Sequence, residues 1–158
     1  MTLSKLYLVA MEGPNKDTHV EAQYNPKEIG VEKGATWSPA KTPTGNAPKL
    51  EFTAGSNRTM SLELTFDEYE TGQNVHSKYV EKIVNFAMVM NEGGSKDDDK
   101  RPPKVSVVWG DNKLPKFTGV VESVSTKYTM FLPDGTPVRA TVNVKLKEAE
   151  KLGFKKGT

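Results

Sequence analysis

Apolar and polar residues alternate along two runs near the C-terminus, residues 120–131 and 137–147. The apolar positions of the second run are Val138, Ala140, Val142, Val144 and Leu146. In the first run we expect one buried face, made of Val120, Val124, Thr126, Tyr128 and Met130. A period of two places successive side chains on opposite faces, so each run predicts a strand with one buried and one wet face. The Pro- and Gly-containing segment between the runs predicts a turn.

The second run has a wholly polar second face. Its residues are Arg139, Thr141, Asn143, Lys145 and Lys147. Such a face suits an ordinary sandwich hairpin, a sheet that lines a water-filled space, or an edge made for another subunit. The alternation by itself leaves these three uses open.

Further periodic segments complete the expected order of elements. Alternation predicts strands over residues 3–11, 18–24, 59–66 and 105–109, the first two of which can pair as a hairpin. Residues 74–91 switch to helical spacing, with Asn74 as a plausible N-cap. The apolar stripe of this helix is Val75, Tyr79, Ile83, Phe86, Ala87 and Met90.

Residues 34–57 follow neither period and are rich in Pro and Gly. They predict a long loop with room for one further strand, and loops of this length in compact domains are usually functional or disordered. Trp37, Leu50 and Phe52 are its apolar anchors.

One helix among many strands predicts a mainly β protein, an antiparallel barrel or sandwich with one packed α-helix. The 158 residues match one domain that buries roughly 70% of its unfolded surface. We expect residues 1–148 to form that domain and residues 149–158 to form a polar C-terminal tail.

The composition limits the classes of partner and site that we expect. A net charge of +2 gives no reason to expect nucleic acid or an anionic membrane surface, and no apolar run reaches the roughly 20 residues that direct membrane insertion requires. The absence of cysteine excludes disulfides and Cys-based sites. The N-terminus has no long apolar signal region, so we expect synthesis in the bacterial cytoplasm without a signal peptide.

No residue pattern supports catalysis. His19 and His76 have no spacing that pairs them, and no serine lies in a G-x-S-x-G turn. The acidic residues at 67, 68 and 70 are expected to face solvent or the N-terminus of the following helix. For Trp37 and Trp109, packing in the core or at an interface is favoured over stacking on a base or sugar. We therefore expect no enzyme, no metal site and no cofactor.

An ordered series of short segments resembles a known family. The segments are QYNPKEI at residues 23–29, Trp37 with the Pro-rich stretch, and residues 55–67, 101–105, 108–110, 117–121, 128–131 and 134–140. Together they resemble the tube-type baseplate proteins of contractile injection systems, the phage-tail-like particles that puncture other cells. The resemblance covers about residues 5–148.

The resemblance implies a tail-tube fold assembled as a homohexameric ring, in which strands of six subunits join around a lumen. This ring would join spike to inner tube at the baseplate and nucleate tube assembly, with neighbouring tube, spike and baseplate proteins as partners. The particle itself stays in the cytoplasm or is released. Relatives often continue into a LysM-like domain; here the chain stops at Thr158, so another protein has that role, or this is a short variant or a fragment.

Within such a ring we expect Trp37, Leu50 and Phe52 to contact an adjacent subunit or the next ring. The polar face at residues 139–147 is expected to line the lumen, and the alternative is an outward face toward a sheath or baseplate protein. Two other functions stay open: the main inner-tube subunit, and a secreted carbohydrate- or protein-binding β-sandwich module.

Overall fold

The computed structural model describes residues 3–40, 45, 49–90, 100–110 and 114–149. The predicted strands are present, and the described part of the chain is mainly β. In chain order they are β1 (Tyr7–Ala10), β2 (His19–Glu21), β3 (Ile29–Glu32), β4 (Ala35–Pro39), β5 (Leu50–Gly55), β6 (Thr59–Asp67), β7 (Val105–Val108), β8 (Phe117–Phe131) and β9 (Pro137–Glu148). A π-helical turn, η1 (His76–Val80), leads into the helix α1 (Glu81–Asn85).

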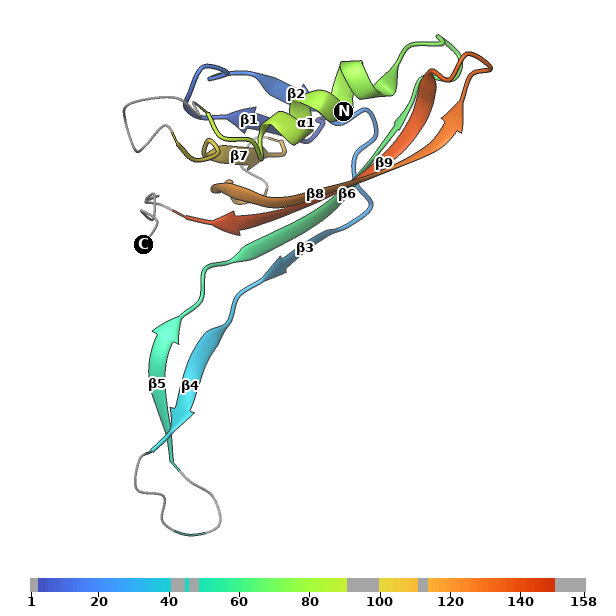
Figure 1. The fold of residues 1–158 in the computed structure, drawn as a ribbon. Coiled ribbons are helices and arrows are strands. Elements are labelled where there is room, and N and C mark those ends of the chain that lie inside the picture. The colour runs from blue at the N-terminus through green and yellow to red at the C-terminus, as the bar shows by residue number, and fades with distance from the viewer. Residues whose placement is uncertain (1–2, 41–44, 46–48, 91–99, 111–113, 150–158) are drawn as a thin grey trace.

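Seven strands form one antiparallel sheet in the order β2-β1-β7-β8-β9-β6-β3. The sheet bends strongly, so that β1, β2 and β7 form a layer above β8, β9, β6 and β3 (Figure 1). The arrangement is sandwich-like, and in the described residues the sheet does not close into a barrel, because β2 and β3 remain its edges. The predicted hairpin of the first two strands is confirmed.

The core lies between the two layers and is closed by the helical segment. Phe66, Phe86 and Phe117 are among the largest fully buried side chains, and Tyr79 stacks on Phe66 with ring centroids 4.3 Å apart. The apolar face of β9 is buried over its whole length, as its alternation predicts. Burial of these side chains is the main driving force for the fold.

The helix is shorter than its sequence pattern predicts. Its stripe packs on the core as expected, with Ile83 and Phe86 buried, but regular helix ends at Asn85 and is followed by a turn at residues 86–87. Asn74 caps the first turn, because its Oδ1 accepts hydrogen bonds from the amides of His76 (2.8 Å) and Ser77 (3.4 Å).

The buried face of β8 changes along the strand, which corrects one sequence expectation. Val121 is buried and pairs with Leu146, whereas Val124 pairs with Val144, so the register shifts between Val121 and Ser123. A β-bulge of this kind inserts one residue and exchanges the faces of the side chains that follow. Val120 therefore does not share a face with Val124.

The prediction of a long loop over residues 34–57 is wrong. β4 and β5 pair as a hairpin that continues the β3–β6 ribbon and projects away from the body (Figure 1). We call residues 35–55 the arm. Every described residue of its two strands is exposed, so the short alternation in these strands does not come from burial in the chain's own core.

The segment that follows β2 joins distant parts of the sheet through side-chain amides. Gln23 donates to the carbonyl of Asp67 (2.8 Å) and accepts from its amide (2.7 Å), in the manner of a paired strand residue. Asn25 likewise accepts from the amide of Leu6 and donates to the carbonyl of Ser4, each at 2.9 Å. This explains the residue types at two positions of the QYNP segment.

Candidate functional site

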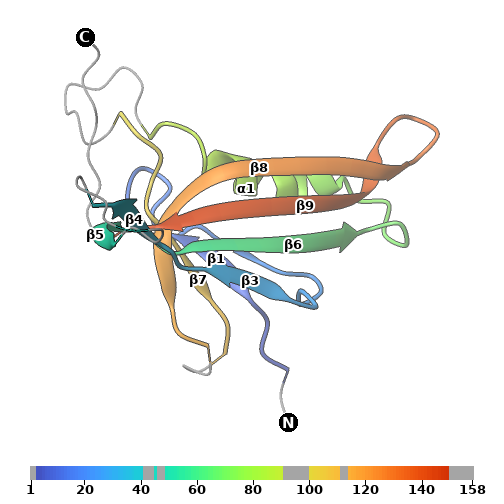
Figure 2. The same ribbon diagram turned by 90° about the horizontal axis from the view of Figure 1, so that it is seen from below.

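The polar face predicted from β9 is part of a broad polar surface. Strands β3, β6, β9 and β8 contribute to it, and α1 lies behind it in Figure 2. The register places Asn143 between Glu63 and Ser125, and Lys145 between Ser61 and Ser123. These rows surround a hollow of about 540 Å³. We call this surface the polar sheet face.

All five side chains predicted for this face lie on it. Asn143, Lys145 and Lys147 are exposed, and Arg139 and Thr141 are half-buried. Two of the charges are matched on the face itself, because Arg139 pairs with Asp67 (3.1 Å) and Lys145 lies 3.9 Å from Glu122. Such a surface is wet and carries both signs of charge.

The four strands that carry the polar sheet face end in two open edges. β3 pairs on one side only, with β6. β7 pairs with β8 only over residues 117–119, so the outer edge of β8 beyond its bulge has no partner strand in the described residues. Unpaired edges present rows of N–H and C=O groups that can join another strand.

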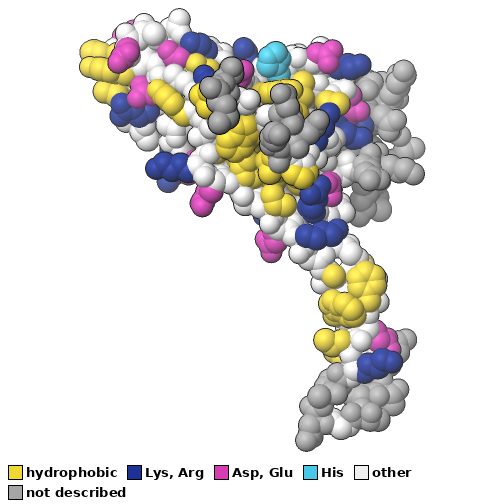
Figure 3. Space-filling view, turned by 180° about the vertical axis from the view of Figure 1, so that it is seen from behind, with side chains coloured by type: hydrophobic (Ala, Val, Ile, Leu, Met, Phe, Trp, Pro, Cys, Tyr) yellow, Lys and Arg dark blue, Asp and Glu magenta, His cyan; other side chains and the backbone are white. Residues whose placement is uncertain are grey.

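The arm is amphipathic, although nothing covers it. Trp37 lies opposite Phe52 with ring centroids 5.4 Å apart, and Pro39 lies opposite Leu50, on the same face of the hairpin. On the other face, the hydroxyls of Ser38 and Thr53 are 2.9 Å apart. Trp37 is 56% exposed and Phe52 is 59% exposed, and the apolar side chains are visible on the projecting arm in Figure 3.

A sheet with one polar face, free edges and an uncovered apolar arm is built for contact with other chains. A family model described as contractile injection system tube protein matches residues 2–156. The chain belongs to this family. A search of curated proteins found no match.

The base of the arm in this tube protein is fixed by Arg58. Its guanidinium pairs with Glu148 at the end of β9, through Nη2 and, at 3.0 Å, through Nε. It also lies over the ring of Phe117, 5.6 Å from the centroid, a cation–π contact. The hydrogen bond from Arg58 holds the pKa of Glu148 below its ordinary value. The direction in which the arm leaves the sheet is thereby tied to β8 and β9.

Sequence reasoning missed the role of Glu68, which was expected to face solvent or the helix N-terminus. The residue is buried, and its carboxylate accepts from Tyr79 Oη (2.7 Å), Lys78 Nζ (2.9 Å) and Thr71 Oγ1 (2.7 Å). These hydrogen bonds, that of Tyr79 first, lower the pKa of Glu68 to about 2. The carboxylate therefore joins the end of β6 to the helix. One sequence feature could have indicated this role: an acidic residue lies between a predicted strand and a predicted helix, and that helix carries a lysine and a tyrosine.

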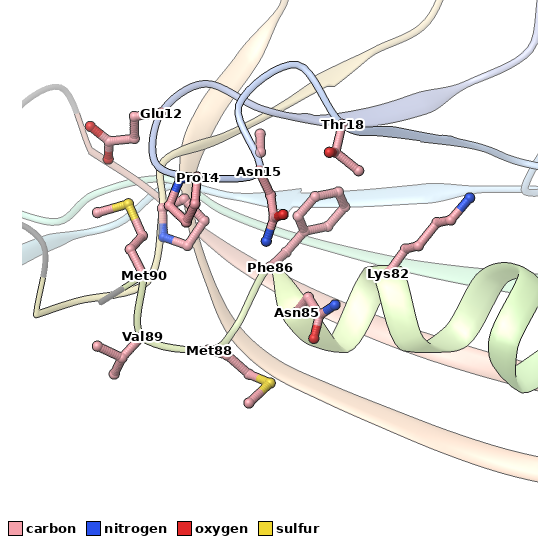
Figure 4. A pocket seen from close by; sticks show the side chains of 12 residues that line it. Glu12, Pro14, Asn15, Thr18, Lys82, Asn85, Phe86, Met88, Val89 and Met90 are labelled. Atoms are coloured by element: carbon pink, nitrogen blue, oxygen red, sulfur yellow. The ribbon is translucent and has the colours of Figure 1, made fainter. Parts of the chain in front are cut away.

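A cavity of about 320 Å³ lies where the β1–β2 turn meets the end of α1 (Figure 4). Phe86, Met88, Val89 and Pro14 give it an apolar lining, with Glu12 and Lys82 at opposite ends. Glu12 is paired with Arg101, which lowers the pKa of Glu12.

The remaining candidates for chemistry do not meet in space. His76 Nδ1 lies 2.6 Å from the Tyr128 hydroxyl, whereas His19 packs edge-on against Tyr7. The described residues contain no group of three or more His, Asp or Glu side chains that could hold a metal ion. No helix among them is long and apolar enough to cross a membrane. Trp109 packs against the core and donates to the carbonyl of Ser4 (3.1 Å), whereas Trp37 is on the arm.

Proposed function

We propose that this tube protein is a structural, non-enzymatic ring component at the baseplate of a contractile injection particle. Six copies form a tube-like ring that joins spike to inner tube and nucleates tube assembly. The observation that carries the proposal is the four-stranded unit β3-β6-β9-β8, which has one polar face, one core face and two open edges.

The two open edges match in side-chain alternation. On β3, Ile29 and Val31 lie opposite the buried Leu62 and Met60 and therefore face inward, with Gly30 facing outward. On β8, Val124 and Tyr128 pack inward, whereas Ser123 and Ser125 face outward. Pairing of β8 in one copy with β3 in the next thus continues both the apolar and the polar faces across the seam.

In a closed ring of this kind, the polar sheet face can line the lumen. A lumen must be wet and must not retain what passes, and a surface of hydroxyls, amides and matched charges meets both needs. We assign Arg139, Thr141, Asn143, Lys145 and Lys147 to the lumen wall. Trp37, Leu50 and Phe52 on the arm are assigned to contacts with neighbouring subunits or rings, because an exposed aromatic pair is characteristic of a docking element.

The baseplate position rests on the resemblance of residues 58–67 and 134–140 to the baseplate-type members. The second candidate is the main inner-tube subunit, and the position of the arm supports it. The arm leaves the molecule at the start of β6, opposite the end at which β6 meets η1, so identical copies can stack repeatedly (Figure 1). A carbohydrate-binding module based on Trp37 and Trp109 is disfavoured, because the packed Trp109 and the arm do not form one surface.

Electron microscopy of the intact particle tests the proposal. We expect six copies of this chain in one ring at the tube base, with the polar sheet face toward the lumen. A ring of another order, or a sheet turned with its polar face outward, contradicts it. Copy number per particle separates the two candidates, because a baseplate ring needs six copies and a main tube needs many.

A further inference from the structure

The arm presents an apolar face for which the described part of its own chain provides no cover. Trp37, Pro39, Leu50 and Phe52 lie on this face, and the strands that carry them pair with each other and are exposed at every residue. An isolated two-stranded hairpin is only marginally stable in water. Aromatic anchors of this kind carry most of the binding energy where a second chain covers them.

A hollow lined by polar side chains and by two tyrosine rings lies at the other end of β6. It encloses about 370 Å³, and its lining includes Gln23, Tyr24, Asp67, Tyr69, Glu70 and Arg139. Tyr24 and Tyr69 are 56% and 54% exposed, so both rings are available to a partner. We call this site the tyrosine hollow.

The tyrosine hollow is held in shape by hydrogen bonds. Asp67 pairs with Arg139 (3.1 Å) and accepts from the amide of Tyr69 (3.0 Å). The side chain of Gln23 bridges both backbone groups of Asp67. A site with fixed walls binds without a large ordering cost.

The arm cannot reach the tyrosine hollow of its own chain. The arm joins β6 at Thr59 and the hollow begins at Asp67, and a strand of this length separates its two ends by about 27 Å. Figure 1 places the arm and the end of β6 at opposite ends of the molecule. A contact between these two ends is therefore head-to-tail between copies. Such a contact either closes into a ring or repeats along one axis, and a tube requires the second.

The charges of the two ends are complementary. The arm contains two lysines and one glutamate. In the hollow, Asp67 is neutralised by Arg139, which leaves Glu70 exposed and without an ion pair to a described residue. Lys49, just before β5 at the end of the arm far from the sheet, is likewise exposed, so these two groups suit each other.

We propose that the tyrosine hollow of one copy receives the apolar face of the arm of a second copy in the adjacent ring. Trp37 and Phe52 pack against Tyr24 and Tyr69, and Lys49 lies beside Glu70. This inference rests on the proposed tube function, in which six such contacts act together between rings. Each contact is small, and the six gain strength from being linked.

A complementation experiment with the full chain tests the contact. The arm variant, Trp37→Ser with Phe52→Ser, keeps an intact hollow, and the hollow variant, Tyr69→Ser with Glu70→Lys, keeps an intact arm. We expect neither to stack alone, whereas an equimolar mixture forms arm–hollow pairs, measured by sedimentation and electron microscopy. The control variant Ser38→Ala with Thr53→Ala changes the other face of the arm and should stack like the original chain. An arm variant that still stacks overturns the proposal.

Disulfide trapping locates the contact, because the chain has no cysteine of its own. A mixture of Phe52→Cys and Tyr69→Cys copies should cross-link under mild oxidation at least roughly tenfold more than a mixture of Thr53→Cys and Tyr69→Cys copies. Equal cross-linking of the two mixtures overturns the assignment. The ring proposal is tested separately. Single six-fold rings formed by the arm variant would support the ring proposal. Arm–hollow pairs from a chain that forms no ring would contradict the ring proposal and leave the arm contact standing.

Discussion

Gly119 lies so close to the backbone of Lys147 that an added Cβ would collide with the carbonyl oxygen of Lys147 and lie 2.8 Å from Cα of Glu148. At this point β8 pairs with both neighbours, since Gly119 lies opposite Val105 on β7 and Glu148 on β9. Only a residue without a side chain permits this approach of strands.

The first prediction is that Gly119→Ala lowers the free energy of unfolding by about 1–3 kcal/mol, because backbone atoms cannot move aside without strain. Urea denaturation measures the change. Gly55→Ala is the matched control, since nothing lies within 4 Å of its added Cβ. Equal effects of the two substitutions would show that the close approach at Gly119 is not a constraint.

The second prediction concerns Glu68. Glu68→Gln should lower the free energy of unfolding at pH 7 by about 1–3 kcal/mol, because Lys78, Tyr79 and Thr71 lose their charged acceptor. The pKa of Glu68 falls from 4.5 to about 2 on folding, so the carboxylate stabilises the fold fully above pH 4.5. That contribution is lost as the pH falls through 4.5 toward 2.

Denaturation of both chains across this pH range checks the prediction. The difference between them should shrink as the pH falls, and Glu70→Gln, at an exposed carboxylate, should change stability by no more than about 0.5 kcal/mol at any pH. A difference that is constant with pH would rule out the ionised carboxylate as its source.

The third prediction concerns the helix stripe. Phe86 is 2% exposed, so Phe86→Ala should cost about 3–5 kcal/mol of unfolding free energy, through lost burial and the cavity that remains. Met88→Ala, two residues on and exposed, should cost little. Thermal denaturation provides the comparison, and similar melting temperatures for the two variants would contradict the packing of this face on the sheet.

The fourth prediction is that the arm is dispensable for folding and required for assembly. Ala35 lies opposite Gly55, so an Asn-Gly turn in place of residues 36–54 closes the ribbon without uncovering any buried residue. The melting temperature should stay within a few degrees of that of the original chain, while tube assembly is blocked. Normal particles from this chain would mean that the arm is a tolerated extension.

The fifth prediction concerns the polar sheet face. Thr141→Leu with Asn143→Leu should leave ring formation intact, because both side chains lie on the polar sheet face and not in the core. Substitutions at surface positions away from the core usually change stability by no more than about 0.5 kcal/mol each. If the face lines the lumen, the variant should alter what passes through the tube. Electron microscopy and a delivery assay separate the outcomes: failure to bind sheath or baseplate proteins, with an unchanged lumen, would place the face outward.

The sequence by itself determined the elements that bury one face. β6 and β9 alternate because one side of each packs in the core, and the helix shows its stripe for the same reason. The polar face of β9 could be recognised from the sequence, because its residues alternate with the apolar residues of the buried face. An element that buries one face in the chain's own core shows a regular spacing of apolar residues in the sequence.

The tertiary structure decided the rest, because those features depend on neighbours that no local pattern records. Val120 and Val121 are both apolar, so only their pairing with β9 shows which one faces the core. Glu68 is buried only because Lys78 and Tyr79 from the helical segment meet it there. The described strands of the arm have an apolar and a polar face, but both faces are exposed. The alternation is therefore confined to a few residues among Pro and Gly, and only the pairing of β4 with β5 shows that these residues form strands.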